Sequence, residues 1–405
     1  MSKSKDRDKD KIFDLFDLFS EAEELELEDV NIEAEELAIE FLPLVVQTMA
    51  KAAPEAAVAL KRVIELKMEK FELPVMTYPG SIPEVKIGAT KAEGGTRGKV
   101  IKVGGETCPP YYRFESPPKN RPIIALDVFD QPIVPLAGPV KASYKDVLDD
   151  PAEWAKKAIQ VYGADLISLH LVSTDPTLKD TSVQEAAKTV ERVLQAIDEP
   201  IIIGGSGNPQ KDLQIFQYIG EITAGERLVF ASATIDMDLE AVAKAMSKTK
   251  HNVVALAFMD INQAKELSRK LIGSGLPKDH LIIDPTTGAL GYGIEYSFSV
   301  MERIRLSGLM GDESLQAPIS CAATNAWAAR EAWMKVDEWG PREYRGPLWE
   351  ATTAIVGLLA GADMFMMMHP LAAKIVKGLA EILSKPKLDT KLEEINYSDW
   401  VKMKV

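Results

Sequence analysis

Eight short apolar segments alternate with amphipathic segments from residue 122 onward. The apolar segments read PIIALDV, ADLISLHLV, PIIIGG, RLVFAS, NVVALAF, HLIID, APISC and ADMFMM. Their length and their β-branched residues are typical of strands that are buried on both faces. Eight such strands alternating with helices predict a (β/α)8 TIM barrel, an α/β fold. The alternative is an open doubly wound sheet, which more often has fewer strands or a nucleotide-binding fingerprint.

The clearest helical pattern between these strands covers residues 182–197. One face is apolar and consists of Val183, Ala186, Ala187, Val190, Val193, Leu194 and Ile197. Ser182 and Glu185 have the spacing of a capping box at the start of this helix.

The first 120 residues follow other patterns. Helical periodicity runs from residue 12 to 70 and includes ten acids and no base between 21 and 40. The Pro and Gly residues of LPVMTYPGSIP interrupt it, and EVKIG and GKVIKVGGE then alternate as the two strands of a β-hairpin would. We therefore predict an acidic helical N-terminal extension that is partly disordered (1–72), a linker and β-hairpin (73–120), the barrel (121–388) and a C-terminal tail (389–405).

Charge is distributed unevenly along the chain. The 405 residues include 47 bases and 61 acids, a formal net charge of -14. Residues 1–50 hold 15 acids and 5 bases, so 46 acids and 42 bases remain elsewhere. Binding to nucleic acid requires clustered Lys and Arg, so we expect no nucleic-acid partner.

The cysteine count and the apolar stretches exclude several further classes. Cys108 and Cys321 are the only cysteines, too few for a disulfide framework or for a zinc or iron–sulfur site held by this chain alone. The start MSKSKDRDKDK lacks the apolar region of a secretory signal, and FLPLVVQTMA is too short to span a membrane. We expect a cytoplasmic protein with no membrane association and no metal of its own.

Polar residues follow every predicted strand. The loops after the strands form the functional mouth of a (β/α)8 barrel, so these residues are the candidates for chemistry. They are Asp127, Asp130, His170, Ser173, Thr174, Asp175, GGSGNP (204–209), Ser232, Thr234, Asp236, Asp260, Asn262, DPTTGALGYG (284–293), Thr324, Asn325 and MMMHP (366–370).

Each candidate has a functional and a structural interpretation. GGSGNP could direct backbone amides at a polar ligand, or form a tight turn; it is no dinucleotide fingerprint, because Gln210 stands where glycine is required. Asp284 could accept hydrogen bonds from a heterocycle, or cap a turn. Asn325 could present its amide to a ligand, or cap the helix that AWAAREAW suggests.

Two further groups have the same ambiguity. His170 and His369 could transfer protons, but a lone histidine on an apolar strand is more often a hydrogen-bonded core residue. Met366, Met367 and Met368 could pack on a flat macrocycle, although core packing is the default for alternating strand residues. The stretch DEWGPREYRGPLWE (337–350), interpreted as an insertion after the seventh helix, is either a docking surface or a loop with buried aromatics.

Nine segments together resemble the delta subunit of the acetyl-CoA decarbonylase/synthase complex, the counterpart of the small subunit of the bacterial corrinoid iron–sulfur protein. They occur in unbroken order between about residues 84 and 370, and residues 1–72 lie outside them. The segments are GATKAEGGTRGKVIKVGGE, DVFD, DPAEWAKKA, LHLVSTDP, IGGSGNPQKD, IDPTTGALGYG with MERIRL, TNAWAARE, WGPREYRGP and MMMHP.

The resemblance implies a barrel that pairs with a gamma (large) subunit inside the larger acetyl-CoA decarbonylase/synthase assembly. In this family the gamma subunit carries the corrinoid (cobamide) and a [4Fe–4S] cluster, so this chain would hold no cofactor alone. The corrinoid carries a methyl group between a tetrahydropterin and the nickel centre that makes or cleaves acetyl-CoA, in anaerobic one-carbon metabolism. The delta barrel is expected to cover the corrinoid without catalysing a step alone.

A mouth that abuts a corrinoid would satisfy the amides around that cofactor with backbone N–H groups and hydroxyls. The cofactor-binding residues predicted on this basis are Ser173, Thr174, Gly205, Ser206, Gly207, Asn208, Thr234 and Thr287. No catalytic residue is assigned under this hypothesis.

Two other hypotheses stay open. The family's barrel is similar to pterin-binding methyltransferases, so the barrel itself could transfer the methyl group to the partner's cobalt, with Asp284 and Asn325 beside the pterin. A third hypothesis makes the acidic extension an adaptor that joins the heterodimer to the larger assembly; the alternative is a solvated arm that enhances solubility.

Overall fold

A computed structural model describes residues 75–111, 118–131 and 136–385, and these residues contain one eight-stranded parallel sheet. Its order is β8-β7-β6-β5-β4-β3-β10-β9, and a parallel bridge between Ile283 and Ile319 joins its two ends. The predicted (β/α)8 barrel is therefore confirmed. The strands are β3 (Ile123–Phe129), β4 (Leu166–His170), β5 (Ile201–Gly204), β6 (Val229–Ala233), β7 (Asn252–Leu256), β8 (Leu281–Asp284), β9 (Ser320–Ala322) and β10 (Met364–Met367).

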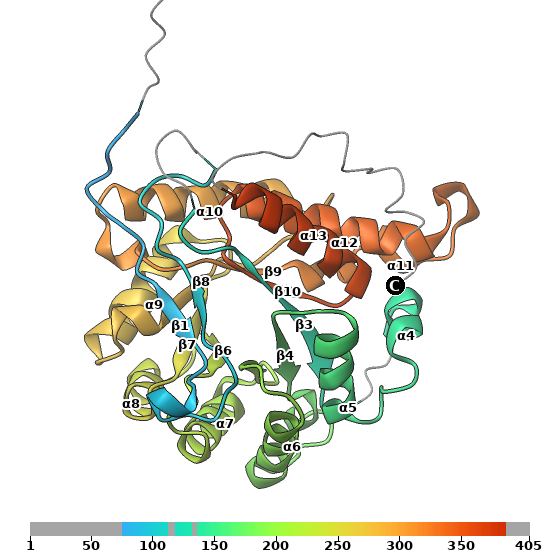
Figure 1. Cartoon of the computed structure of the whole chain (residues 1–405), viewed down its shortest axis with the longest axis horizontal. Coiled ribbons are helices and arrows are strands. Elements are labelled where there is room, and N and C mark those ends of the chain that lie inside the picture. The colour runs from blue at the N-terminus through green and yellow to red at the C-terminus, as the bar shows by residue number, and fades with distance from the viewer. Residues whose placement is uncertain (1–74, 112–117, 132–135, 386–405) are drawn as a thin grey trace, which may run out of the picture. The chain divides into compact units, whose positions relative to one another are not determined.

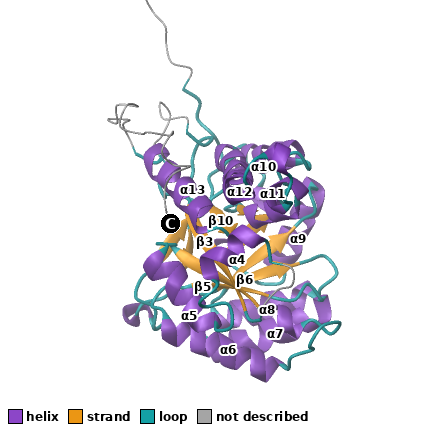
Figure 2. Cartoon of the chain, turned by 90° about the vertical axis from the view of Figure 1, so that its right-hand side faces the viewer, coloured by secondary structure: helices purple, strands orange, loops and turns teal. Residues whose placement is uncertain are grey.

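Helices surround the strands (Figures 1 and 2). Figure 1 shows α10, α12 and α13 on one side of the strands and α6, α7 and α8 on the other. The helices are α4 (Gly138–Tyr144), α5 (Pro151–Lys156), α6 (Val183–Ala196), α7 (Pro209–Ile222), α8 (Leu239–Thr249), α9 (Ile261–Gly273), α10 (Ile294–Leu309), α11 (Arg330–Trp333), α12 (Arg342–Leu359) and α13 (Pro370–Leu383). In the part of the chain described, no helix combines the length and apolarity needed to cross a bilayer.

Helix α6 is the predicted helix of residues 182–197; six of the seven residues of its predicted apolar face are buried, and Val183 is partly buried. Half of the predicted capping box forms: the Ser182 hydroxyl accepts a hydrogen bond from the Glu185 amide at 3.3 Å. The other half, a bond from the Ser182 amide to the Glu185 carboxylate, is not among the hydrogen bonds of the described residues. That carboxylate accepts from Lys188 instead, at 2.6 Å.

The inside of the barrel is apolar, and its base is closed by the predicted β-hairpin. Strands β1 (Val85–Ile87) and β2 (Ile101–Val103) pair antiparallel, which confirms the hairpin. Its buried side chains join those of the strands in one cluster, which comprises Val85, Ile87, Val103, Ile123, Ala125, Leu166, Ile202, Val229, Ala231, Val254, Ile282, Met364 and Met366. Side chains from alternate strand positions thus fill the barrel as a core.

Polar contacts attach the hairpin to the base. Arg97, which follows β1, donates from Nε to Glu226 at 3.0 Å and from Nη1 to the carbonyls of Leu194 and Ile197 at 3.0 Å each. The Asn252 side chain at the start of β7 donates to the Lys86 carbonyl at 2.8 Å. The hairpin therefore blocks the N-terminal end of the barrel, and the opposite end is left to form a site.

The interpretation of residues 337–350 as an insertion after the seventh helix is wrong. Residues 342–350 are the first half of α12, the helix between β9 and β10, and Pro347 lies inside it. The short segments before it are a 3-10 helix (Ala323–Ala328), α11 and a second 3-10 helix (Asp337–Trp339). The segment contains two Gly-Pro pairs, which are typical of loops, but Pro341 occupies the N-cap position of the helix.

The predicted N-terminal extension (1–72) and C-terminal tail (389–405) lie outside the described residues. The division of the chain into domains therefore stays a prediction beyond the barrel and its hairpin.

Candidate functional site

The mouth of the barrel brings together polar side chains from neighbouring strands. Asp127 on β3 and His170 on β4 point to the same side, and Nε2 of His170 donates to Oδ1 of Asp127 at 3.0 Å. The Ser168 hydroxyl lies 3.3 Å from the same nitrogen. The His170 ring stacks on Phe129, with ring centroids 5.0 Å apart. The sequence prediction treated His170 as a lone histidine, whereas the structure pairs it with a buried carboxylate.

The glycine-rich loop after β5 donates hydrogen bonds to a carboxylate in the helix that follows it, α7. The amides of Ser206 and Gly207 donate to the Asp212 carboxylate at 2.7 and 2.9 Å, and the Ser206 hydroxyl donates to it at 3.0 Å. Burial raises the pKa of Asp212, and these hydrogen bonds oppose that shift. Asn208 caps α7 by accepting from the Lys211 amide at 3.0 Å. The loop is thus a structured turn whose amides point at Asp212.

Ser173 and Thr174, in the short 3-10 helix Val172–Thr174 after β4, also have internal partners. The Ser173 amide donates to Asp130 at 3.0 Å, and the Ser173 hydroxyl bonds the same carboxylate. The Thr174 hydroxyl donates to the Leu171 carbonyl at 2.6 Å. Both residues are buried, so their hydroxyls shape the mouth from below its surface.

Asp284, Thr287 and Asn325 lie together on the opposite side of the mouth. Asp284 accepts from the Thr286 amide at 2.8 Å, which confirms its turn role, and burial raises its pKa to about 6. The Thr287 hydroxyl donates to Sγ of Cys321 at 3.4 Å. Asn325 lies within a 3-10 helix and donates to the Thr287 carbonyl at 3.0 Å, so the prediction that it caps a helix is wrong.

Three buried side-chain atoms at the strand ends have no hydrogen-bond partner among the described residues. They are Oδ2 of Asp127, Oγ1 of Thr234 and Oγ1 of Thr324. Buried polar atoms are nearly always paired, so unpaired ones at a barrel mouth indicate where a ligand or water binds. Thr234 is the one member of the eight predicted cofactor-binding residues whose side chain is in this group. Whether the eight contact a cofactor stays a prediction.

The segment after β10 is structural, as the blander interpretation predicted. Met366 packs inside the barrel and Met367 against the helices, and both are buried. His369 caps α13 by accepting from the Leu371 amide at 3.2 Å, and burial lowers the His369 pKa to about 4. Glu350 on α12 accepts from the amides of Met368 and His369 at 2.5 and 2.9 Å.

Aromatic side chains are exposed on the loops that follow β7, β8 and β9. Phe258 is 59% exposed and Tyr296 is 65% exposed. We call the exposed aromatic residues of these loops and of the helices next to them the aromatic rim. It consists of Phe258 and Tyr292 in loops, Tyr296 in the first turn of α10, Trp333 at the end of α11, Trp339 in the second 3-10 helix and Tyr344 in the first turn of α12. Exposed apolar groups gathered in this way are typical of interaction sites.

The segment 337–350 combines both predicted alternatives. Trp339 and Tyr344 are exposed, as a docking surface requires, with the Arg345 guanidinium 5.4 Å from the Trp339 ring centre. Trp349 is partly buried and donates from Nε1 to the Leu290 carbonyl at 2.9 Å.

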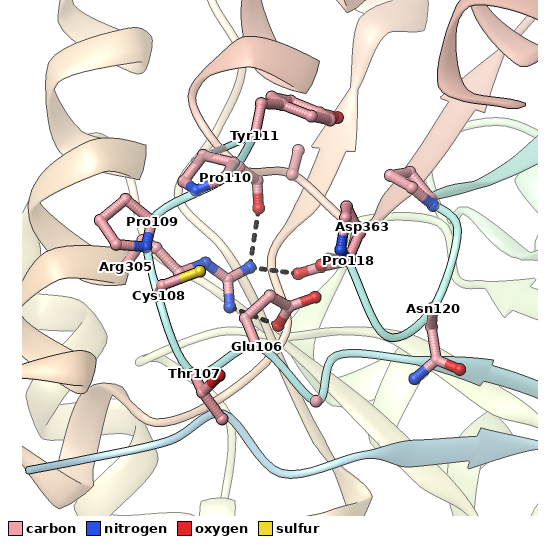
Figure 3. Close-up of a pocket in the computed structure, with 14 residues that line it drawn as sticks. Glu106, Thr107, Cys108, Pro109, Pro110, Tyr111, Pro118, Asn120, Arg305 and Asp363 are labelled. Atoms are coloured by element: carbon pink, nitrogen blue, oxygen red, sulfur yellow. Dashed lines mark hydrogen bonds and ion pairs between the residues drawn. The ribbon is translucent and has the colours of Figure 1, made fainter. Parts of the chain in front are cut away.

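A small pocket lies at the opposite, N-terminal end of the barrel (Figure 3). Arg305 of α10 points between Glu106 and Asp363 there, donating to Glu106 at 2.9 Å and to the Gly361 carbonyl at 2.7 Å. Burial and the Asp363 carboxylate raise the pKa of Glu106. The cavity of about 40 Å³ has room for a few water molecules only and is too small for a large cofactor.

Three buried polar residues of the site were not predicted from the sequence: Ser168, Asp212 and Glu350. Ser168 lies beside Asp127 in the β3–β4 register, a pairing that follows only once neighbouring strands are aligned. Asp212 and Glu350 are acids on otherwise apolar helix faces, a signal that marks a buried carboxylate without naming its partner. No group of three or more His, Cys, Asp or Glu within residues 75–111, 118–131 and 136–385 could hold a metal ion.

Comparison with known proteins places the chain among delta subunits. The family model for the CO dehydrogenase/acetyl-CoA synthase delta subunit matches residues 84–337. The acetyl-CoA decarbonylase/synthase complex subunit delta of Methanocaldococcus jannaschii is 46% identical, over 93% of each chain. The protein of the same name from Archaeoglobus fulgidus is 50% identical over 81% of this chain and 75% of its own length.

Solved structures of dihydropteroate synthase are similar in fold. The enzyme from Coxiella burnetii in complex with pteroic acid has a TM-score of 0.47 and 13% identity, covering 75% of this chain and 99% of its own. A sulfonamide complex of the Yersinia pestis enzyme has a TM-score of 0.47 and 15% identity, covering 66% and 95%.

Proposed function

The chain belongs to the acetyl-CoA decarbonylase/synthase delta subunit family, and from this premise we propose that its barrel pairs with a gamma subunit and covers that subunit's corrinoid. The barrel would be a non-catalytic member of the complex, active through what its mouth binds and excludes. The methyl group carried between a tetrahydropterin and the nickel centre would pass while the barrel shields the corrinoid from water.

The aromatic rim is the observation that carries this proposal. Six exposed aromatic residues present apolar surface to water at the C-terminal ends of neighbouring strands, and covering this surface with a partner would lower the free energy. Trp and Tyr are also the residue types that contribute most per contact at protein interfaces. The described residues around the barrel are otherwise rich in charged pairs, as solvent-facing helices are.

The residues at the mouth also fit a cofactor with amide side chains. When bound, a corrinoid supplies a cobalt that accepts and donates the methyl group. On the side of this chain, the hydroxyls of Thr234 and Thr324 have no hydrogen-bond partner among the described residues and could pair with amides. Ser173, Thr174, Thr287 and the loop 205–208 are already bonded internally, so we propose that they hold the shape of the mouth against the cofactor.

Reconstitution tests the pairing and the shielding together. The corrinoid-loaded gamma subunit is reduced, and the visible spectrum of its cobalt is followed after a pulse of oxygen, with and without this chain. We expect re-oxidation to slow several-fold when this chain is present. An unchanged rate at saturating concentrations of this chain would refute shielding.

Rim variants test where the partner binds. Replacing Phe258 or Tyr296 with serine should raise the dissociation constant for the gamma subunit about thirtyfold each, the effect of losing an interface residue worth about 2 kcal/mol. Ile222→Ser and Met310→Ser are the controls, because these apolar residues are also exposed, at 42% and 58%, but lie at the C-terminal ends of α7 and α10, at the base of the barrel. Equal effects from both pairs would mean that the partner does not dock on the rim.

One observation favours the alternative of a pterin-binding methyltransferase. The carboxyl of Asp284 is buried at the mouth with a pKa raised to about 6, so it could share a proton with a ring nitrogen near neutral pH. Asn325 donates to the carbonyl of Thr287, three residues after Asp284. Calorimetry of this chain alone with a methylated tetrahydropterin should then show binding that Asp284→Ala abolishes. Absence of binding by the unmodified chain would eliminate this alternative.

A further inference from the structure

The Asp127–His170 pair fixes which atom of the histidine faces the mouth. A carboxylate offers only acceptors, so the nitrogen 3.0 Å from Oδ1 of Asp127 is the one that carries hydrogen, Nε2. In the neutral imidazole the second ring nitrogen, Nδ1, is then an acceptor. Stacking on Phe129 fixes the plane of the His170 ring, so the direction in which Nδ1 accepts a hydrogen bond is fixed too.

Glycine at the end of the neighbouring strand leaves space beside that nitrogen. A Cβ atom at position 204 would lie 2.9 Å from Nδ1, closer than normal contact. Gly204 is the last residue of β5. Like Ile202, two residues before it, position 204 faces the inside of the barrel, so the space beside Nδ1 lies at the mouth. His170 is 23% exposed, and the described residues give its Nδ1 no hydrogen bond.

The carboxylate behind the histidine is only half satisfied. Asp127 is 1% exposed, and its Oδ2 has no hydrogen-bond partner among the described residues. An incompletely bonded carboxylate in such a place costs free energy. If the pair only filled the core, nothing would offset this free-energy cost, because an apolar side chain could pack there without the cost.

We propose that Asp127 orients His170 so that Nδ1 accepts a hydrogen bond from an N–H donor of the ligand at the mouth. His170 is the contacting residue and Asp127 a positioning residue. The inference rests on the proposed function, in which the ligand is the corrinoid and the donor is one of its peripheral carboxamides. Neither His170 nor Asp127 was among the cofactor-binding residues predicted from the sequence.

Two replacements of His170 separate the proposed role from a purely structural one. Asparagine places its amide near the position of Nδ1 and gives up the contact with Asp127. Glutamine reaches toward Asp127 and gives up Nδ1. Using the corrinoid-loaded gamma subunit, we expect His170→Gln to raise the concentration of this chain that gives half-maximal shielding about threefold to tenfold relative to the unmodified chain, the effect of one lost hydrogen bond. His170→Asn should stay closer to the unmodified chain, and Gly204→Ala, which fills the space beside Nδ1, should match His170→Gln.

A purely structural role predicts the reverse order, in which His170→Gln is tolerated and His170→Asn is impaired. That order would overturn the inference. Equal behaviour of all three variants and the unmodified chain would also overturn it. If every variant is impaired, the ¹⁵N resonance of Nδ1 decides, and it is assignable because the chain has four histidines. The resonance should shift with corrinoid-loaded gamma subunit and not with the corrinoid-free subunit; no difference refutes the contact. If the unmodified chain gives no shielding at all, the proposed function itself has failed.

Discussion

At the scale of single residues, burial decides how the carboxyl groups around the mouth ionise. Glu350 is fully buried, and this raises its pKa to about 8 although two backbone amides donate to it. Asp284, across the barrel, has its pKa raised to about 6 by the same cause. Near neutral pH, therefore, Glu350 is mostly protonated, and the mouth has less negative charge than its sequence suggests.

The Glu350 pKa predicts a pH dependence of stability. The folded state holds the Glu350 proton up to about pH 8, whereas the unfolded chain releases it near 4.5. The contribution is thus fully present below about pH 4.5 and is lost as the pH rises to about 8. Glu350→Gln should remove this loss, so that the stability of the unmodified chain relative to the variant falls by on the order of 1 kcal/mol per pH unit in this window. Denaturant unfolding between pH 5 and 8 measures it.

The matched control for this titration is Glu343→Gln, about two turns earlier on α12 and exposed to solvent. Its stability should follow the unmodified chain at every pH. Parallel curves for the Glu350 variant and the unmodified chain would contradict the assignment of the pH dependence to Glu350.

We expect the Asp212 carboxylate to stabilise the turn after β5. Asp212→Ala removes the acceptor of two amides and one hydroxyl, so we expect a loss of about 2 kcal/mol in the free energy of unfolding. Glu221→Ala is the control, because Glu221 makes an ion pair exposed on both sides and should change stability by less than about 0.5 kcal/mol. Thermal or urea unfolding compares them; equal stabilities would mean that water replaces Asp212.

At the scale of elements, the strands were predictable and the bonds between loops were not. A strand buried on both faces needs a continuous apolar run, so segments such as PIIIGG signal their position by composition alone. The partners of the loop residues depend on which strands become neighbours: the Asp127–His170 pair requires the β3–β4 register, and Asn325 reaches Thr287 because β8 and β9 meet. Local sequence does not contain that information.

The mistake at residues 337–350 has a similar cause. Gly-Pro pairs are strong loop signals, yet Arg345 here bonds the carbonyls of Glu331, Met334 and Gly340 and so fixes the preceding turns to the first turns of α12. This tertiary contact outweighs the intrinsic cost of Pro347 within the helix.

Arg305 joins α10 to the loops at the base of the barrel, so we expect its replacement to destabilise the fold. Arg305→Gln would leave the buried Asp363 and Glu106 without their cation, so the free energy of unfolding should fall by about 3–5 kcal/mol. Arg192→Gln breaks an ion pair with Asp150 that is exposed, and should cost less than about 1 kcal/mol. Comparable losses for the two variants would show that the buried network contributes no more than a surface pair.

At the scale of the whole molecule, net charge separates the N-terminal residues from the remainder. Residues 1–50 have ten more acids than bases, and the other 355 residues are within four charges of neutrality. A nearly neutral body suits a subunit that is covered by partners. The acidity, by contrast, belongs to residues outside the described structure and outside the family match at 84–337.

This separation predicts a salt effect that only the N-terminal acids control. If they steer the chain to a basic surface of the assembly, association with the other subunits should weaken as salt rises, because screening shortens the reach of exposed charges to about 10 Å at 0.1 M. Replacing Glu23, Glu24, Glu35 and Glu36 by glutamine should lower the association rate at low salt and flatten its salt dependence. The same change at Glu153, Glu185, Glu221 and Glu240, exposed acids of the barrel helices, removes equal charge and should leave the rate near that of the unmodified chain. Surface-binding kinetics at two salt concentrations distinguish the cases: identical slopes for both quadruple variants would mean that total charge, and no adaptor segment, sets the rate.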